Sequence, residues 1–103
     1  MTEVLVKKST NPKKKLDIII TDNKKVTTLS IGDADYEDYT IHKDDIRKQK
    51  YISRHKDKED WTYGGRFTKG YWSYNLLWRK KSLNKAIEYL NNKYKSMNVK
   101  KAF

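Results

Sequence analysis

The stretch LDIIITDNKKVTTLSI, residues 16–31, predicts the sheet around which the rest of the chain is organised. Apolar side chains at positions 16, 18 and 20 alternate with their neighbours, which is the period of a strand with one buried face. The polar run 22–25 between two β-branched segments indicates a hairpin loop. Another β-branched segment at 4–8 precedes them, so we expect an N-terminal three-stranded antiparallel meander.

Three helices are expected after the meander. Acids followed by cations predict a helix over 44–56, because that charge order suits the helix dipole. The apolar stretch 71–78 predicts a short helix, and apolar residues at helical spacing predict an amphipathic helix over 82–94. We therefore expect one α+β domain over residues 1–103, with about three helices packed on one face of the meander. The basic residues 96–103 are expected to form a frayed tail.

The chain is strongly basic, with a net charge of +11 from 24 Lys and Arg against 13 acids. Such an excess favours an acidic partner, namely nucleic acid, an anionic surface or an acidic protein, although it also serves solubility alone. One acidic block, residues 33–45, either masks a basic neighbour or repels nucleic acid locally.

The chain has no cysteine, which excludes disulfides, thiol catalysis and Cys-ligated zinc. Neither a signal peptide nor an apolar run of about 18 residues is evident. We therefore expect an intracellular protein that is not secreted and has no membrane span.

A basic stripe on the helix expected at 44–56 is the main candidate for a phosphate-contacting face. Helical spacing places its cations on one side, where they could neutralise phosphates. The alternative is an ordinary solvated helix face. The stripe consists of Arg47, Lys50, Arg54 and Lys58, and a second basic run consists of Lys13, Lys14 and Lys15.

All three tryptophans and six of the eight tyrosines lie between positions 36 and 78, interleaved with cations. Such rings stack on nucleic-acid bases, or they build the core of a small domain. Trp72 and Trp78 are six residues apart and would point to different faces of one helix, so at least one should fill the core. Tyr51 and Trp61 are the candidate interface aromatics, and Trp61 is expected to be partly exposed.

No constellation of catalytic or metal-binding residues is evident. His42 and His55 are the only histidines, and no spacing typical of a metal site includes them. There is no Gly-rich phosphate loop and no nucleophile elbow. We expect no catalytic residue, no metal, no cofactor and no enzymatic activity.

Four segments carry a resemblance to a known family: DYTIHKD at 38–44, YISRHK at 51–56, EDW at 59–61 and GYWSYNLLWRK at 70–80. They are similar to motifs of small basic proteins from nucleocytoplasmic large DNA viruses, the giant viruses of amoebae and algae. Tyr74 departs from the pattern, because the family is expected to have a cation there. The resemblance implies a viral origin and a place in the virion or in a viral factory of the host cytoplasm, and it supplies no catalytic residue.

Together these features predict a non-enzymatic virion-associated or nucleoid protein. It would bind nucleic acid, DNA rather than RNA, electrostatically and with little sequence preference. The alternative is a structural interaction module, such as a minor capsid component that bridges coat proteins through exposed aromatics, with an acidic viral structural protein as its partner. A continuous positive face favours the first hypothesis, and an exposed aromatic patch favours the second. The sequence leaves the oligomeric state open.

Overall fold

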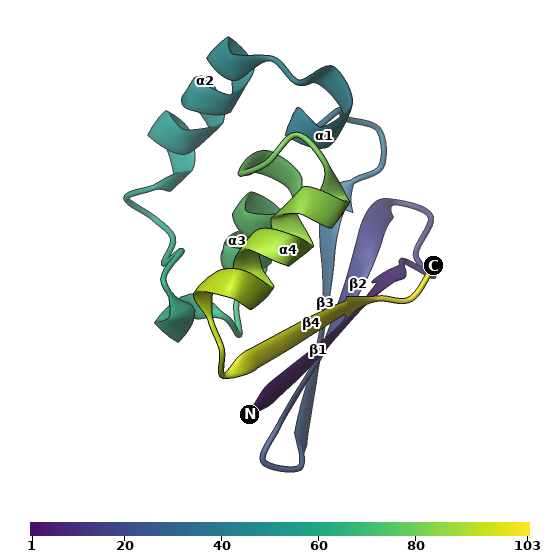
Figure 1. Cartoon of the computed structure of the whole chain (residues 1–103). Coiled ribbons are helices and arrows are strands. Elements are labelled where there is room, and N and C mark those ends of the chain that lie inside the picture. The colour runs from purple at the N-terminus through teal and green to yellow at the C-terminus, as the bar shows by residue number, and fades with distance from the viewer.

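The computed structural model describes residues 1–103 and has an α+β architecture, with a mixed four-stranded sheet covered by helices on one face (Figure 1). The three N-terminal strands form the predicted antiparallel meander, and a fourth, C-terminal strand pairs parallel with the first. The sheet order is therefore β3-β2-β1-β4. The strands are β1 (Thr2–Lys8), β2 (Lys14–Asp22), β3 (Lys25–Asp33) and β4 (Met97–Lys101).

Helices fill the chain between β3 and β4. Asp44 caps α2, because its carboxylate accepts from the backbone N–H groups of Ile46 and Arg47, and Ser82 caps α4. The longest helices have 11 residues, and no helix combines the length and the apolar composition that crossing a membrane requires. The helical segments are α1 (Tyr39–His42), α2 (Asp45–His55), the 3₁₀ turn η1 (Tyr63–Gly65), α3 (Lys69–Trp72), the π-helix η2 (Ser73–Trp78) and α4 (Leu83–Lys93).

The hairpin between β2 and β3 turns on two residues, Asn23 and Lys24, which have φ angles of 48° and 70°. Positive φ at both central positions is the type I′ geometry, whose twist matches that of the flanking strands. This turn fixes a register in which Leu16 lies opposite Ile31. The apolar side chains that alternate along the two strands therefore share one face of the sheet, as the sequence predicts.

That face carries the hydrophobic core. Leu90 of α4 and Trp72 of α3 are fully buried there in one cluster with the apolar residues of the strands, while Leu83 and Ile87 pack at the margin. Helices α3, η2 and α4 lie across the sheet, whereas α2 stands to one side (Figure 1) and contributes no residue to this core. The predicted packing is confirmed for the two later helices and is wrong for the helix expected over 44–56.

Residues 96–103 are not a frayed tail, so that prediction is wrong. Met97 and Val99 are buried in β4. These two apolar residues alternate with polar ones, but the lysines around them make the segment resemble a basic tail. Asn91 of α4 closes the outer edge of this strand, because its side-chain amide donates to the Val99 carbonyl at 2.9 Å and accepts from the Val99 N–H at 2.8 Å. A helix side chain thereby satisfies backbone groups that an edge strand would leave open.

Met97→Ala should lower the free energy of unfolding by about 2–5 kcal/mol, the usual range for truncating a buried methionine. Urea denaturation followed by circular dichroism measures this change. Lys100→Ala, at an exposed position of the same strand, is the matched control and should change stability by less than about 0.5 kcal/mol. Equal unfolding midpoints for the two variants would mean that β4 is not part of the core.

Candidate nucleic-acid interface

Helix α2 is held against the body of the molecule by aromatic stacking. Its aliphatic side chains contribute little, since Ile46 is 70% exposed. The ring of Tyr51 is buried and lies 4.3 Å from the ring of Trp78 with an interplanar angle of 10°. His55 stacks on Tyr51 as well, at 4.2 Å. Large ring faces thus supply the contact area that this helix otherwise lacks.

The loop that follows α2 joins the same stack through Trp61. Its indole ring lies 3.9 Å from the ring of Tyr74 at an interplanar angle of 11°, and 6.4 Å from the ring of Tyr51. The indole N–H donates to Glu59 at 2.9 Å. Trp61 is partly exposed, as the sequence predicts, but one of its faces is occupied.

Tyr51 is not available to a partner. Only 8% of the residue is exposed, and its ring is covered by Trp78. The prediction that Tyr51 is an interface aromatic is therefore wrong, because the helix needs this ring for its own attachment. Trp72 fills the core and Trp78 is only partly buried, which confirms that the two tryptophans point in different directions.

The predicted basic stripe borders a surface groove between α2 and the segment that precedes it. Arg47, Lys50 and Arg54 line this groove, whereas Lys58 lies in the turn beyond the end of α2 and does not. The groove consists of two adjoining hollows of about 370 and 390 Å³. We call it the α2 groove, and the residues that line both of its parts are Tyr36, Glu37, Arg54 and Trp78.

The acidic segment 33–38 forms the other side of the α2 groove. The Glu37 carboxylate lies 3.6 Å from the Arg47 guanidinium, and Asp38 accepts from the Lys15 ammonium at 2.6 Å. The acidic block thus folds back on basic neighbours, which is the first of the two alternatives that the sequence allows. The Glu37–Arg47 pair is weak, because its side chains are 58% and 47% exposed to screening solvent.

The second basic run, residues 13–15, is divided by this arrangement. Lys13 is exposed in the turn before β2, and Lys14 is half-buried at the start of that strand. Lys15 is mostly buried and is held by Asp38. The ion pair with Asp38 competes with the phosphate contact predicted for Lys15, which stays a prediction, while Lys13 and Lys14 keep free ammonium groups.

Several acidic side chains accept hydrogen bonds from the protein itself. The hydroxyls of Ser30 and Ser9 donate to Asp17 at 2.7 Å each, and they hold the pKa of that carboxyl below its ordinary value. The Tyr39 hydroxyl donates to Asp45 at 2.5 Å and likewise lowers the pKa of Asp45. The same effect lowers the pKa of Asp22, with Thr2 and Arg66 as donors, and of Asp60, with Thr62.

The histidines also make contacts within the chain. The Nδ1 atom of His42 accepts from the Asp44 N–H at 2.9 Å, and its ring lies 5.3 Å from that of Trp78. The Nδ1 atom of His55 lies 3.2 Å from the Glu59 carboxylate. The structure contains no group of three or more His, Asp or Glu side chains arranged to hold a metal ion.

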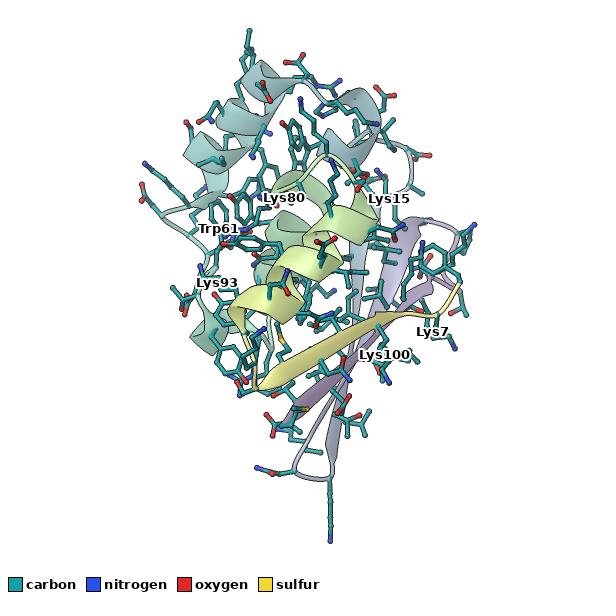
Figure 2. All side chains as sticks on the ribbon, viewed as in Figure 1. Lys7, Lys15, Trp61, Lys80, Lys93 and Lys100 are labelled. Atoms are coloured by element: carbon teal, nitrogen blue, oxygen red, sulfur yellow. The ribbon has the colours of Figure 1, made fainter.

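A second concentration of positive charge surrounds Tyr89 on α4. The guanidinium of Arg79 lies 4.9 Å from the ring centroid, and the ammonium groups of Lys80 and Lys93 lie 4.7 and 5.6 Å from it. None of these cations forms an ion pair with a carboxylate. We call this set the Tyr89 cluster. Lys80 precedes the first residue of α4, and Lys93 is its last residue (both are labelled in Figure 2).

The π turn of η2 positions the arginine of this cluster. The Arg79 backbone N–H donates to the Tyr74 carbonyl at 2.8 Å, which is a bond between residues five apart. This wider turn brings the guanidinium over the Tyr74 ring, at 4.8 Å from its centroid. The guanidinium Nε also donates to the Asn75 side chain at 2.9 Å. Arg79 is therefore fixed between its own helix and the ring of Tyr89.

Lys48 of α2 adds to the positive charge near the cluster. Its ammonium group donates to the Arg79 carbonyl at 2.7 Å. Desolvation, and then the charges of Lys80 and Arg79, lower the pKa of Lys48. Burial is the larger cause, and the smaller contribution of the two neighbouring cations reflects the positive charge around them.

The Tyr89 cluster was not predicted from the sequence, although part of its signal is present there. Tyr89 and Lys93 are four residues apart on a predicted helix and therefore share a face. The contribution of Arg79 depends on a π turn, whose five-residue spacing a search for α-helical periods does not detect.

Tyr51→Ala should detach α2. The free energy of unfolding should fall by about 3–5 kcal/mol, the range for truncating a large buried aromatic side chain. Amide hydrogen exchange within α2 should accelerate, while exchange in the sheet stays slow. Ile46→Ala on the exposed side of the same helix is the control. If α2 amides keep their protection in Tyr51→Ala, then the aromatic stack is not what holds the helix.

Stability should fall on acidification because the aspartates described above have lowered pKa values. A carboxyl with a folded pKa below its ordinary 3.8 contributes stabilisation that is present above that pH and is lost as pH falls through the folded pKa. Urea midpoints measured between pH 6 and pH 2 should therefore decline below about pH 4. Asp17→Asn should flatten the decline more than Asp57→Asn, an exposed position without such donors; equal profiles would contradict this account.

Residues 4–55 match the model of a family of unknown function, DUF5754. The matched segment includes the meander, the acidic segment and α2, whereas the Tyr89 cluster lies outside it. No curated protein and no solved structure matches the chain. Because the match covers 52 of the 103 residues, the chain belongs to the DUF5754 family.

Proposed function

We propose that this protein binds the phosphate backbone of nucleic acid electrostatically, without enzymatic activity and with little sequence preference. The supporting observation is an imbalance in charge pairing. Only three of the 24 Lys and Arg side chains, those of Lys15, Arg47 and Arg66, form ion pairs. A surface with this excess attracts a polyanion, and the release of counterions condensed on that polyanion drives binding.

The proposed contacts on α2 are Arg47, Lys50 and Arg54. They border the α2 groove at helical spacing, and their side chains are exposed. Glu37 competes with phosphate for Arg47, but a half-exposed pair of this kind contributes little and is easily displaced. Lys13, Lys14 and Lys58 extend the proposed contact surface beyond the helix.

The setting of this activity is proposed from the resemblance to proteins of giant viruses. That resemblance favours DNA rather than RNA as the partner. It also favours a role as a virion-associated or nucleoid protein, in the virion or in the viral factory of the host cytoplasm.

The alternative function, a capsid module that bridges coat proteins through exposed aromatics, has less support. Tyr51 is buried and Trp61 is stacked on Tyr74. The most exposed rings, Tyr36 and Phe103, lie in different parts of the molecule, one in the α2 groove and the other beyond β4. Residues that dominate protein interfaces cluster together, and these rings do not.

Binding to a duplex DNA oligonucleotide should be steeply salt-dependent. Neutralising about six to eight phosphates predicts a loss of roughly 10³–10⁵ in affinity between about 50 and 200 mM salt. Fluorescence anisotropy with a labelled duplex measures this loss. Absence of binding at low salt would contradict the nucleic-acid proposal and would favour a protein partner.

The double variant Arg47→Glu/Arg54→Glu belongs to the same test, because it lowers the net charge from +11 to +7 on one helix face. Its affinity for the duplex should collapse while its unfolding midpoint stays close to that of the unmodified protein. Trp61→Ala is the comparison, and it should affect duplex binding less, because paired bases offer no free face for stacking.

A further inference from the structure

The hydroxyl of Tyr89 has a hydrogen that the structure does not use. Its oxygen accepts from the Arg79 guanidinium and from the Lys93 ammonium, each at 3.3 Å. Arginine and lysine have no acceptor, so the hydroxyl hydrogen takes part in neither bond. Tyr89 therefore presents a free O–H donor between two cations.

The cations around this donor are not neutralised. Lys80 and Lys85 line a surface hollow of about 330 Å³ beside Tyr89, together with Glu88 and Asn92. Glu88 is the one acidic residue of that hollow, and it forms no ion pair with either lysine. Positive charge therefore exceeds negative charge here, so an anion would relieve repulsion between like charges.

The charges and hydrogen bonds around the Tyr89 phenol agree with this geometry. Desolvation raises the pKa of the phenol, but the hydrogen bond from Lys93 and the charges of Arg79, Lys93 and Lys80 outweigh it, so the pKa lies below its ordinary value. The surroundings thus favour negative charge at the position of the hydroxyl.

We propose that the Tyr89 cluster is a binding site for a phosphoryl group, with Arg79, Lys80, Lys93 and the Tyr89 hydroxyl as its donors. Several converging donors suit a group with three or more charged oxygens better than a carboxylate with two. The arginine is held by Asn75 and by the ring of Tyr74, so little flexibility is lost when the anion binds.

Two sources can supply this phosphoryl group. One is the backbone of a bound nucleic acid, and that version rests on the function proposed above. The other is a free polyphosphate or nucleotide, which does not depend on it. The experiment therefore uses a single-stranded DNA oligonucleotide and inorganic triphosphate as separate probes, and poly-glutamate as a polyanion without phosphate.

Two double variants isolate the site from general attraction. Lys80→Ala/Lys93→Ala removes two cations of the cluster, and Lys7→Ala/Lys100→Ala removes two from the sheet strands (Figure 2). Both lower the net charge from +11 to +9. Tyr89→Phe keeps the ring and removes only the hydroxyl. Unfolding midpoints of all variants are measured first, and they should remain close to that of the unmodified protein.

Calorimetric titration should show binding that is about tenfold or more weaker in Lys80→Ala/Lys93→Ala than in Lys7→Ala/Lys100→Ala, because hydrogen bonds to charged groups are lost only in the first variant. Tyr89→Phe should also weaken binding, with no change in net charge. If these losses are seen with triphosphate, they support a site for a free polyphosphate. If they are seen only with the oligonucleotide, they support a contact with the nucleic-acid backbone.

Other outcomes overturn the proposal. Equal losses in the two double variants would show diffuse attraction, which leaves the proposed function intact and removes the site. If poly-glutamate also binds, and the same cluster variants weaken its binding equally, the cluster is a site for an acidic protein and not for a phosphoryl group. If the unmodified protein binds neither the duplex nor the single-stranded oligonucleotide at low salt, the proposed function fails, and the triphosphate titration alone decides whether the site exists.

Discussion

The stacking of Tyr51 on Trp78 is the interaction on which the candidate surface depends. Helix α2 shares no residue with the core between the sheet and the other helices. This stack and its extension through Trp61 therefore hold the helix in place, together with the hydrogen bonds from Tyr39 to Asp45 and from Lys48 to the Arg79 carbonyl. The position of α2 in turn creates the α2 groove and sets Arg47 opposite Glu37. The exposed cations of the helix therefore owe their arrangement to buried rings rather than to aliphatic packing.

The excess of unpaired cations at the surface has a structural cause as well as a compositional one. Hydroxyl donors satisfy Asp17 and Asp45, and Asp44 caps a helix. Carboxylates engaged in this way stabilise turns and helix ends, but they are not paired with lysine or arginine. The cations are consequently left without partners at the surface, where they raise the potential that a polyanion meets. Asp22, Glu37 and Asp38 are exceptions, because each is paired with a lysine or an arginine, and Glu37 and Asp38 lower that potential in the α2 groove.

The sequence predicted elements whose signal is local. Alternation in 16–31 predicted the hairpin, and apolar residues at helical spacing predicted the helix that the structure has at Leu83–Lys93. It did not predict features that depend on distant contacts. Strand β4 forms because Asn91 and β1 meet its two edges, so its composition alone resembles that of a tail. The burial of Tyr51 likewise depends on a partner ring 27 residues away, and a helix pattern cannot reveal that ring.

The aromatic residues act differently from a platform for bases. The rings of Trp61 and Tyr74 stack on each other, so each has one covered face. The Arg79 guanidinium lies over the rings of both Tyr74 and Tyr89 and so connects them. A ring whose face is already covered offers less area to an unpaired base, but it holds a cation in a defined direction. Rings of this kind reduce the entropy that a lysine or arginine loses when it binds an anion. The chemistry of this surface is therefore that of ordered cations, which favours recognition of phosphate over recognition of bases.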